Sequence, residues 1–195
     1  MTSPEFLSPT DYRNKIKSPF EFTVSAVRAS GATITAQLPP PKDKTVPLTE
    51  GRAIVSNKIN VADRMDARPQ QSLNWHINEL GEPLFACTPP TGYKEDSSTW
   101  VSPGALIERL NFAMALTDQK LSDVQFDPKK VLGGTDIDKP DAVLNQCVSV
   151  YLQGDISPST RKVLQQTLPV PGDSQTVNPS KLIALIIGSP EFQRK

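Results

Sequence analysis

The side chains that could carry out chemistry are few and scattered along this sequence. His76 is the only histidine among 195 residues, so any triad of nucleophile, histidine and carboxylate must use it. It flanks an apolar stripe of Leu73, Ile77 and Leu80 on an expected helix, which is a position typical of a packed histidine. The sequence therefore predicts no self-contained catalytic site.

The sequence indicates metal or thiol chemistry no more strongly than it indicates a catalytic triad. Cys87 and Cys147 lie far apart and, with His76, lack the close spacing of a zinc site. Cys147 belongs to an apolar stripe and should be buried, whereas Cys87 lies in a loop and is the better candidate for a reactive thiol. The pair Asp136 and Asp138 supplies too few oxygen ligands for calcium. We expect no metal and no cofactor.

Arg109 is the most informative polar residue. It falls within a wide apolar arc of the expected helix 103–117, which comprises Ala105, Leu106, Ile107, Leu110, Ala113, Met114 and Leu116. Because an unpaired buried guanidinium is costly, we expect a carboxylate or several carbonyls as its partners. One interpretation is a structural ion pair, or a stem whose charged end reaches water. The other is a clamp for an anion or a substrate, with Asn111 as a further binding candidate on the same helix.

Two other segments contribute candidates. Glu21 and Arg28 share the polar stripe of an expected helix at 19–30, and the same two interpretations apply to them. Tyr93 and Trp100 belong to a long loop, 85–100, that is rich in proline and glycine. Aromatic residues in such a loop usually fold back as a small satellite core. A surface that faces a ligand or a partner is the alternative.

The helices that position these residues are marked by proline. A small polar residue precedes proline at the start of several apolar-periodic stretches, where it caps a helix and proline takes the first helical position. These pairs are Ser18-Pro19, Ser102-Pro103, Asp127-Pro128, Ser157-Pro158 and Asn178-Pro179. They predict helices at about 19–30, 103–117, 140–153, 158–168 and 179–187, with a sixth at about 69–80 and a short one at 128–132. We expect Gly31, Gly81, Gly154 and Gly188 to end helices in the left-handed conformation.

The expected fold class is mainly α: an irregular helical bundle of about six helices with long Pro-rich loops. Helix 19–30 is apolar on two sides, which predicts a central helix with neighbours on both. Residues 32–35 and 53–55 are the best strand candidates. We expect residues 1–195 to form a single helical module, with a mobile or extended excursion at 37–67 that contains three consecutive prolines.

Charge and hydropathy exclude some classes of function. The sequence has 21 basic and 21 acidic residues without a run of like charge, so it lacks the footprint of a nucleic-acid or anionic-membrane binder. Its longest apolar run, 182–187, is too short to span a membrane. Residues 1–8 show no secretory signal, so the sequence does not indicate a compartment.

A short repeat bears on domain organisation. Ser3-Pro4-Glu5-Phe6 returns as Ser189-Pro190-Glu191-Phe192, where it directly follows an expected helix. The first copy has no helix before it. Unless the recurrence is due to chance, we expect the chain to be the C-terminal part of a larger protein, with a preceding helix missing.

Several motifs resemble one family in the same order. They are Ser3-Pro4-Glu5-Phe6, the run from Tyr12 to Phe22, Gly81-Glu82-Pro83-Leu84-Phe85, Pro89-Pro90-Thr91-Gly92-Tyr93, Trp100-Val101-Ser102, Arg109-Leu110-Asn111-Phe112-Ala113 and the run from Gly188 to Arg194. Together they resemble the large uncharacterised bacterial family called domain of unknown function 1800. The resemblance implies the C-terminal portion of such a protein, whose relatives are often exported. It implies no reaction, so no catalytic residue is carried over.

The function expected from the sequence is a helical packing or interaction module without self-contained catalysis. Its expected partner is another protein or the missing N-terminal portion of the same family domain, and neither nucleic acid nor membrane insertion is expected. The alternative is part of an enzyme active site, hydrolase-like or anion-binding, that the N-terminal portion completes. A self-sufficient hydrolase needs a nucleophile, an oriented base and an oxyanion site, which this inventory does not supply.

Overall fold

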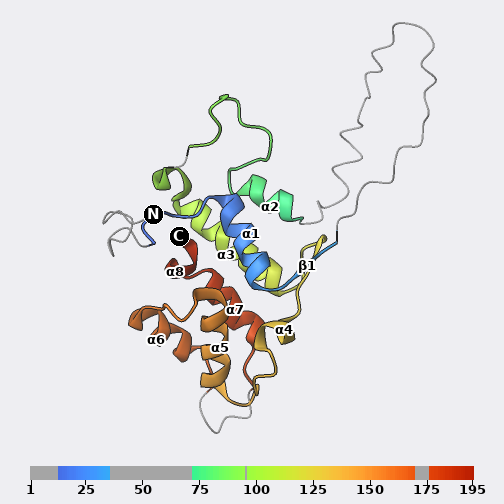
Figure 1. Cartoon of the computed structure of the whole chain (residues 1–195), viewed down its shortest axis with the longest axis vertical. Coiled ribbons are helices and arrows are strands. Elements are labelled where there is room, and N and C mark those ends of the chain that lie inside the picture. The colour runs from blue at the N-terminus through green and yellow to red at the C-terminus, as the bar shows by residue number, and fades with distance from the viewer. Residues whose placement is uncertain (1–12, 36–71, 95, 170–175) are drawn as a thin grey trace, which may run out of the picture.

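The computed structural model describes residues 13–35, 72–94, 96–169 and 176–195, which form a mainly helical fold (Figure 1). In chain order the described elements are α1 (Pro19–Ala29), β1 (Thr33–Ile34), α2 (Leu73–Glu79), the 3₁₀ helix η2 (Ser97–Trp100), α3 (Pro103–Thr117), β2 (Val124–Gln125), α4 (Pro128–Leu132), α5 (Pro140–Leu152), α6 (Pro158–Gln166), α7 (Pro179–Ile187) and α8 (Pro190–Gln193). The mainly α fold class expected from the sequence is confirmed. None of the described helices has the length and apolarity needed to cross a lipid bilayer.

Local capping chemistry explains where most helices begin. Ser18, Ser102, Ser157 and Asn178 each accept a hydrogen bond from a backbone N–H in the first turn of the helix that follows. The expected helix at 69–80 starts too early, because Ser72 has an extended backbone and caps α2 at Leu73. The sequence interpretation also missed α8 and η2, which are too short for a periodic signal.

α1 lies in the middle of the upper half of the molecule and packs against α2, α3 and α5 (Figure 1). Phe22, which is fully buried, makes edge-to-face contacts with Phe112 of α3 at 5.8 Å and Phe192 of α8 at 5.9 Å between ring centroids. Tyr151 of α5 contacts the same Phe192 ring at 6.1 Å, and its hydroxyl lies 2.8 Å from the hydroxyl of Ser30. This aromatic cluster joins the two ends of the described chain to its centre.

α7 forms the other half of the core, and its buried residues pack along α3 and α5. Gly188 does not end this helix in the left-handed conformation that the sequence predicted, because its φ is −75°. A Cβ atom at Gly188 would instead lie 2.5 Å from a methyl carbon of Leu110. The glycine therefore permits a close approach of α7 to α3 rather than a special backbone angle.

The strands are short and connect segments distant in sequence. β1 pairs with β2 in antiparallel register, with Thr33 opposite Gln125 and Ile34 opposite Val124. An isolated antiparallel bridge joins Ile16 to Arg194, so the C-terminal residues lie beside the segment that leads into α1. The expected strand at 53–55, the excursion at 37–67 and the first copy of the repeat lie outside the described residues.

Candidate functional site

One cavity, of about 280 Å³, brings together three of the six residues proposed for binding. It lies where the start of α1, the segment after α2 and the loop that ends in η2 meet. Its lining consists of Lys15, Ile16, Ser18, Phe20, Glu21, Glu82, Tyr93, Lys94 and Trp100. Tyr93 and Trp100 form an edge-to-face pair with ring centroids 6.2 Å apart, which gives the cavity an aromatic wall. Because the pair also lines the cavity, it fits both interpretations of the loop, a satellite core and a surface that faces a ligand.

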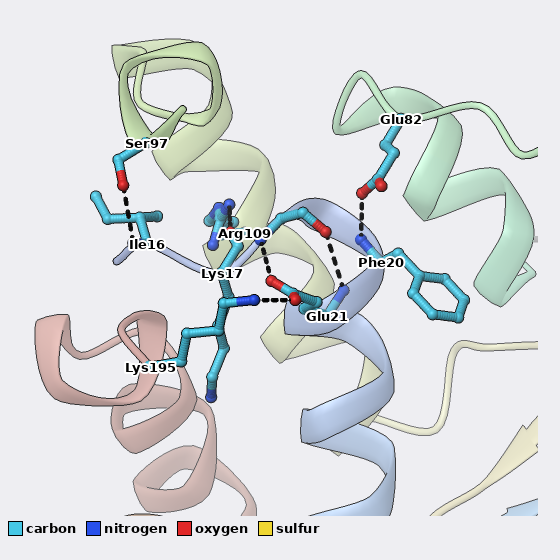
Figure 2. Close-up of polar contacts among 9 residues, drawn as sticks. Ile16, Lys17, Phe20, Glu21, Glu82, Ser97, Arg109 and Lys195 are labelled. Atoms are coloured by element: carbon cyan, nitrogen blue, oxygen red, sulfur yellow. Dashed lines mark hydrogen bonds and ion pairs between the residues drawn. The ribbon is translucent and has the colours of Figure 1, made fainter. Parts of the chain in front are cut away.

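The polar groups of this cavity are largely used to hold the start of α1. Glu21 and Ser18 form a complete capping box, in which each side chain accepts from the other residue's backbone N–H. A carboxylate oxygen of Glu82 accepts from the backbone N–H of Phe20 at 2.8 Å, and Glu21 also pairs with the Lys195 ammonium (Figure 2). The hydroxyl of Tyr93 donates to the carbonyl of Pro83 at 2.7 Å. These carboxylates and this hydroxyl are therefore engaged internally.

Arg109 lies next to Lys17 of the segment that leads into α1 (Figure 2), and only 1% of its surface is exposed. Its Nη2 donates to the carbonyl oxygen of Lys17 at 2.7 Å, and its guanidinium carbon lies 4.8 Å from the centre of the Phe22 ring. Its Nε and Nη1 have no hydrogen-bond partner among the described residues. The sequence predicted a carboxylate or several carbonyls, whereas the described structure provides one carbonyl and one aromatic ring.

Burial has the largest effect on the charges of this region. Burial lowers the pKa of the Arg109 guanidinium to about 10, partly offset by the negative charge of Glu82. Burial, followed by the nearby charge of Arg13, lowers the pKa of Lys17 to about 8. The Lys17 ammonium also lies 4.0 Å from the centre of the Phe192 ring. Arg109 and Lys17 thus lie at the junction between the start of α1 and the C-terminal residues, where their contacts are mainly with a carbonyl and with aromatic rings.

A second hollow, of about 380 Å³, lies between α2 and α3. It is lined by Trp75, His76, Glu108, Asn111, Met114, Ala115 and Lys120. His76 is 3% exposed, and its Nε2 has no hydrogen-bond partner among the described residues. Burial holds the pKa of His76 below its ordinary value, although the charges of Glu108 and Asp123 oppose this. Nothing in the sequence placed Glu108 and His76 together, because α2 and α3 are separated by a long loop.

The outward side of α3 is an unusual surface. Its exposed residues include Leu106, Ile107, Leu110 and Met114, which are 41%, 58%, 41% and 53% exposed. The two charged residues of the helix lie elsewhere, since Arg109 is buried and Glu108 is half-buried. α3 therefore exposes apolar residues on its outward side, while its inward side is also mainly apolar and contains the buried Arg109. We refer to Leu106, Ile107, Leu110 and Met114 as the α3 outer face.

The six candidate residues do not form one site. Glu21, Tyr93 and Trp100 line the first cavity, and Arg109 lies in the same junction without lining it. Asn111 lies in the second hollow. Arg28 is exposed in the last turn of α1, seven residues from Glu21 and so about 10 Å along the axis. No group of three or more potential metal ligands occurs within the described parts of the chain.

Comparison with known proteins gives one match. A family model with the description "Protein of unknown function (DUF1800)" matches residues 1–194. Neither the curated proteins nor the solved structures give a match to the chain. The resemblance inferred from the sequence motifs is thereby confirmed, and the chain belongs to the DUF1800 family of proteins of unknown function.

Proposed function

We propose that this chain is a helical packing and interaction module without self-contained catalysis. In this proposal, the α3 outer face binds a helix on the surface of a partner. The partner is a further portion of the same kind of family domain or a separate protein. The observation that supports this proposal is the exposed apolar stripe of α3, with four partly exposed apolar residues on a side that carries no exposed charge.

Physical chemistry favours a covered face over a solvated one. Single exposed apolar residues are common on proteins, but a contiguous group of them marks an interaction surface or an aggregation hazard. Leu106, Ile107, Leu110 and Met114 recur at helical spacing, so they present one stripe rather than scattered contacts. An amphipathic helix from a partner that lies along such a stripe removes both apolar surfaces from water.

The test compares the full chain with two variants, Ile107→Lys and Met114→Lys. Both side chains are more than half exposed, so lysine at these positions should leave the fold intact. We expect the unmodified chain to bind a hydrophobic dye and to self-associate in sedimentation analysis, because its outer face is uncovered. Each lysine variant should lower both signals by disrupting the stripe.

Val163→Lys is the matched control. Val163 is 57% exposed and lies on α6, away from α3, so its replacement adds the same charge at a similar exposure. This control should keep the dye and sedimentation signals of the unmodified chain. A strictly monomeric chain without dye binding would contradict the proposal, as would equal effects of the control and the two α3 variants.

A further inference from the structure

The hollow between α2 and α3 adjoins the α3 outer face. Met114 belongs to both, since it lines the hollow and is 53% exposed on the outer face. A segment that covers the α3 outer face would therefore also border this hollow at Met114. The polar groups inside the hollow then specify what the covering segment should carry.

Glu108 contributes a carboxylate to the hollow. One of its carboxylate oxygens accepts from the side-chain amide of Asn111 at 3.3 Å, and it forms no ion pair within the described residues. The other charge in the lining, Lys120, is already paired with Asp118 at 2.9 Å. The Glu108 carboxylate is thus left as a partner for a cation.

His76 provides an independent indication of a missing polar partner. Its ring packs edge-to-face against Trp75 at 4.8 Å and Phe112 at 5.3 Å, and its buried Nε2 has no hydrogen-bond partner in the described structure. A buried nitrogen without a partner is unfavourable, so such atoms usually have a ligand or an ordered water nearby. A neutral imidazole nitrogen can accept a hydrogen bond from an N–H group.

We propose that this hollow receives the guanidinium of an arginine carried by the helix that covers the α3 outer face. This inference rests on the proposed function. A guanidinium matches the hollow in two ways: it pairs with a carboxylate such as Glu108 through two N–H groups, and it stacks on an aromatic ring such as Trp75. Arginine is also among the residues that most often anchor protein interfaces.

Three synthetic helical peptides test this assignment. They share one leucine stripe at i, i+3, i+4 and i+7 and differ at one central position, which carries arginine, lysine or citrulline, the uncharged analogue of arginine. Binding to the full-length chain is measured by anisotropy of a labelled peptide. We expect the arginine peptide to bind about fivefold or more tightly than the citrulline peptide, with the lysine peptide between them.

Two conservative variants localise the effect. Glu108→Gln should abolish the preference for arginine over citrulline, because the preference depends on the negative charge of the carboxylate. Glu79→Gln, on the exposed side of α2 and outside the lining, removes the same charge and should keep the preference.

The outcomes separate the two proposals. Equal affinities of the arginine and citrulline peptides, or a preference that persists in Glu108→Gln, would overturn the arginine assignment and leave docking on α3 in place. A lysine peptide that binds as tightly as the arginine peptide would overturn the choice of a guanidinium. Failure of all three peptides to bind would overturn the docking proposal and this inference together.

Discussion

Replacing Arg109 by methionine should change stability very little, although Arg109 is a buried charge. Each unit of pKa corresponds to about 1.4 kcal/mol, so lowering the guanidinium pKa from an ordinary ~12.5 to about 10 destabilises the fold by about 3 kcal/mol. Opposing this are the hydrogen bond to Lys17, worth ~1.5–3 kcal/mol, and the contact with Phe22, worth ~1 kcal/mol. These contributions nearly cancel. We therefore expect Arg109→Met to lie within about 1.5 kcal/mol of the unmodified chain.

The measurement is urea unfolding at pH 7 followed by circular dichroism. Arg109→Ala is the matched comparison, because it removes the same charge but leaves a cavity, and it should cost about 3 kcal/mol. A guanidinium paired with a buried carboxylate would behave differently, since its removal leaves an uncompensated charge and costs ~3–5 kcal/mol. A loss of 3 kcal/mol or more in Arg109→Met, matching the loss in Arg109→Ala, would refute the reasoning.

Three further predictions concern the same junction and the two thiols. The pKa of Lys17 is lowered to about 8, so its charge destabilises the folded chain at neutral pH, and this effect is lost as the pH rises from 8 toward ~10.4. The unfolding free energy of the unmodified chain should therefore rise over this pH range relative to that of Lys17→Met. Parallel pH profiles of the two proteins would contradict this prediction. Burial raises the pKa of the Cys147 thiol to about 12, so iodoacetamide should modify the partly exposed Cys87 in the native chain and Cys147 only after unfolding, as peptide mass spectrometry would show. Ser18→Ala removes the cap of α1 and should lower the unfolding free energy by ~1 kcal/mol, or the melting temperature by roughly 2–4 °C. Ser18→Thr should retain most of the stability. Equal melting curves for Ser18→Ala and the unmodified chain would show that the cap does not contribute.

The positions of the helices could be predicted from the sequence because their signals are local. The capping box of Ser18 and Glu21 spans three residues, and its hydrogen bonds form within the first turn of the helix. α3 has the same bounds in the structure as in the sequence prediction, since Ser102 and Pro103 fix its start and its apolar residues continue to Thr117. Such features need no knowledge of the rest of the chain.

The candidate site could be predicted only in part, because its contacts are long-range. Periodicity placed Arg109 in an apolar arc, and it is buried, but its carbonyl partner lies 92 residues earlier in the chain. Composition likewise shows that a side of α3 is apolar without showing whether a neighbour covers it. The two apolar sides of helix 19–30 predict a central helix, and α1 does pack against three helices, but no comparable signal marks the apolar residues that α3 leaves exposed.

The contact between Glu21 and Lys195 imposes an order of events during synthesis. The two residues are 174 positions apart, so at ~5–20 residues per second a ribosome needs roughly 9–35 s to travel from one to the other. During that interval α1 exists without Lys195, without Phe192 against Phe22 and without the bridge to Ile16. The aromatic surface of α1 thus remains open to chaperones until the final residues of the described chain have been made.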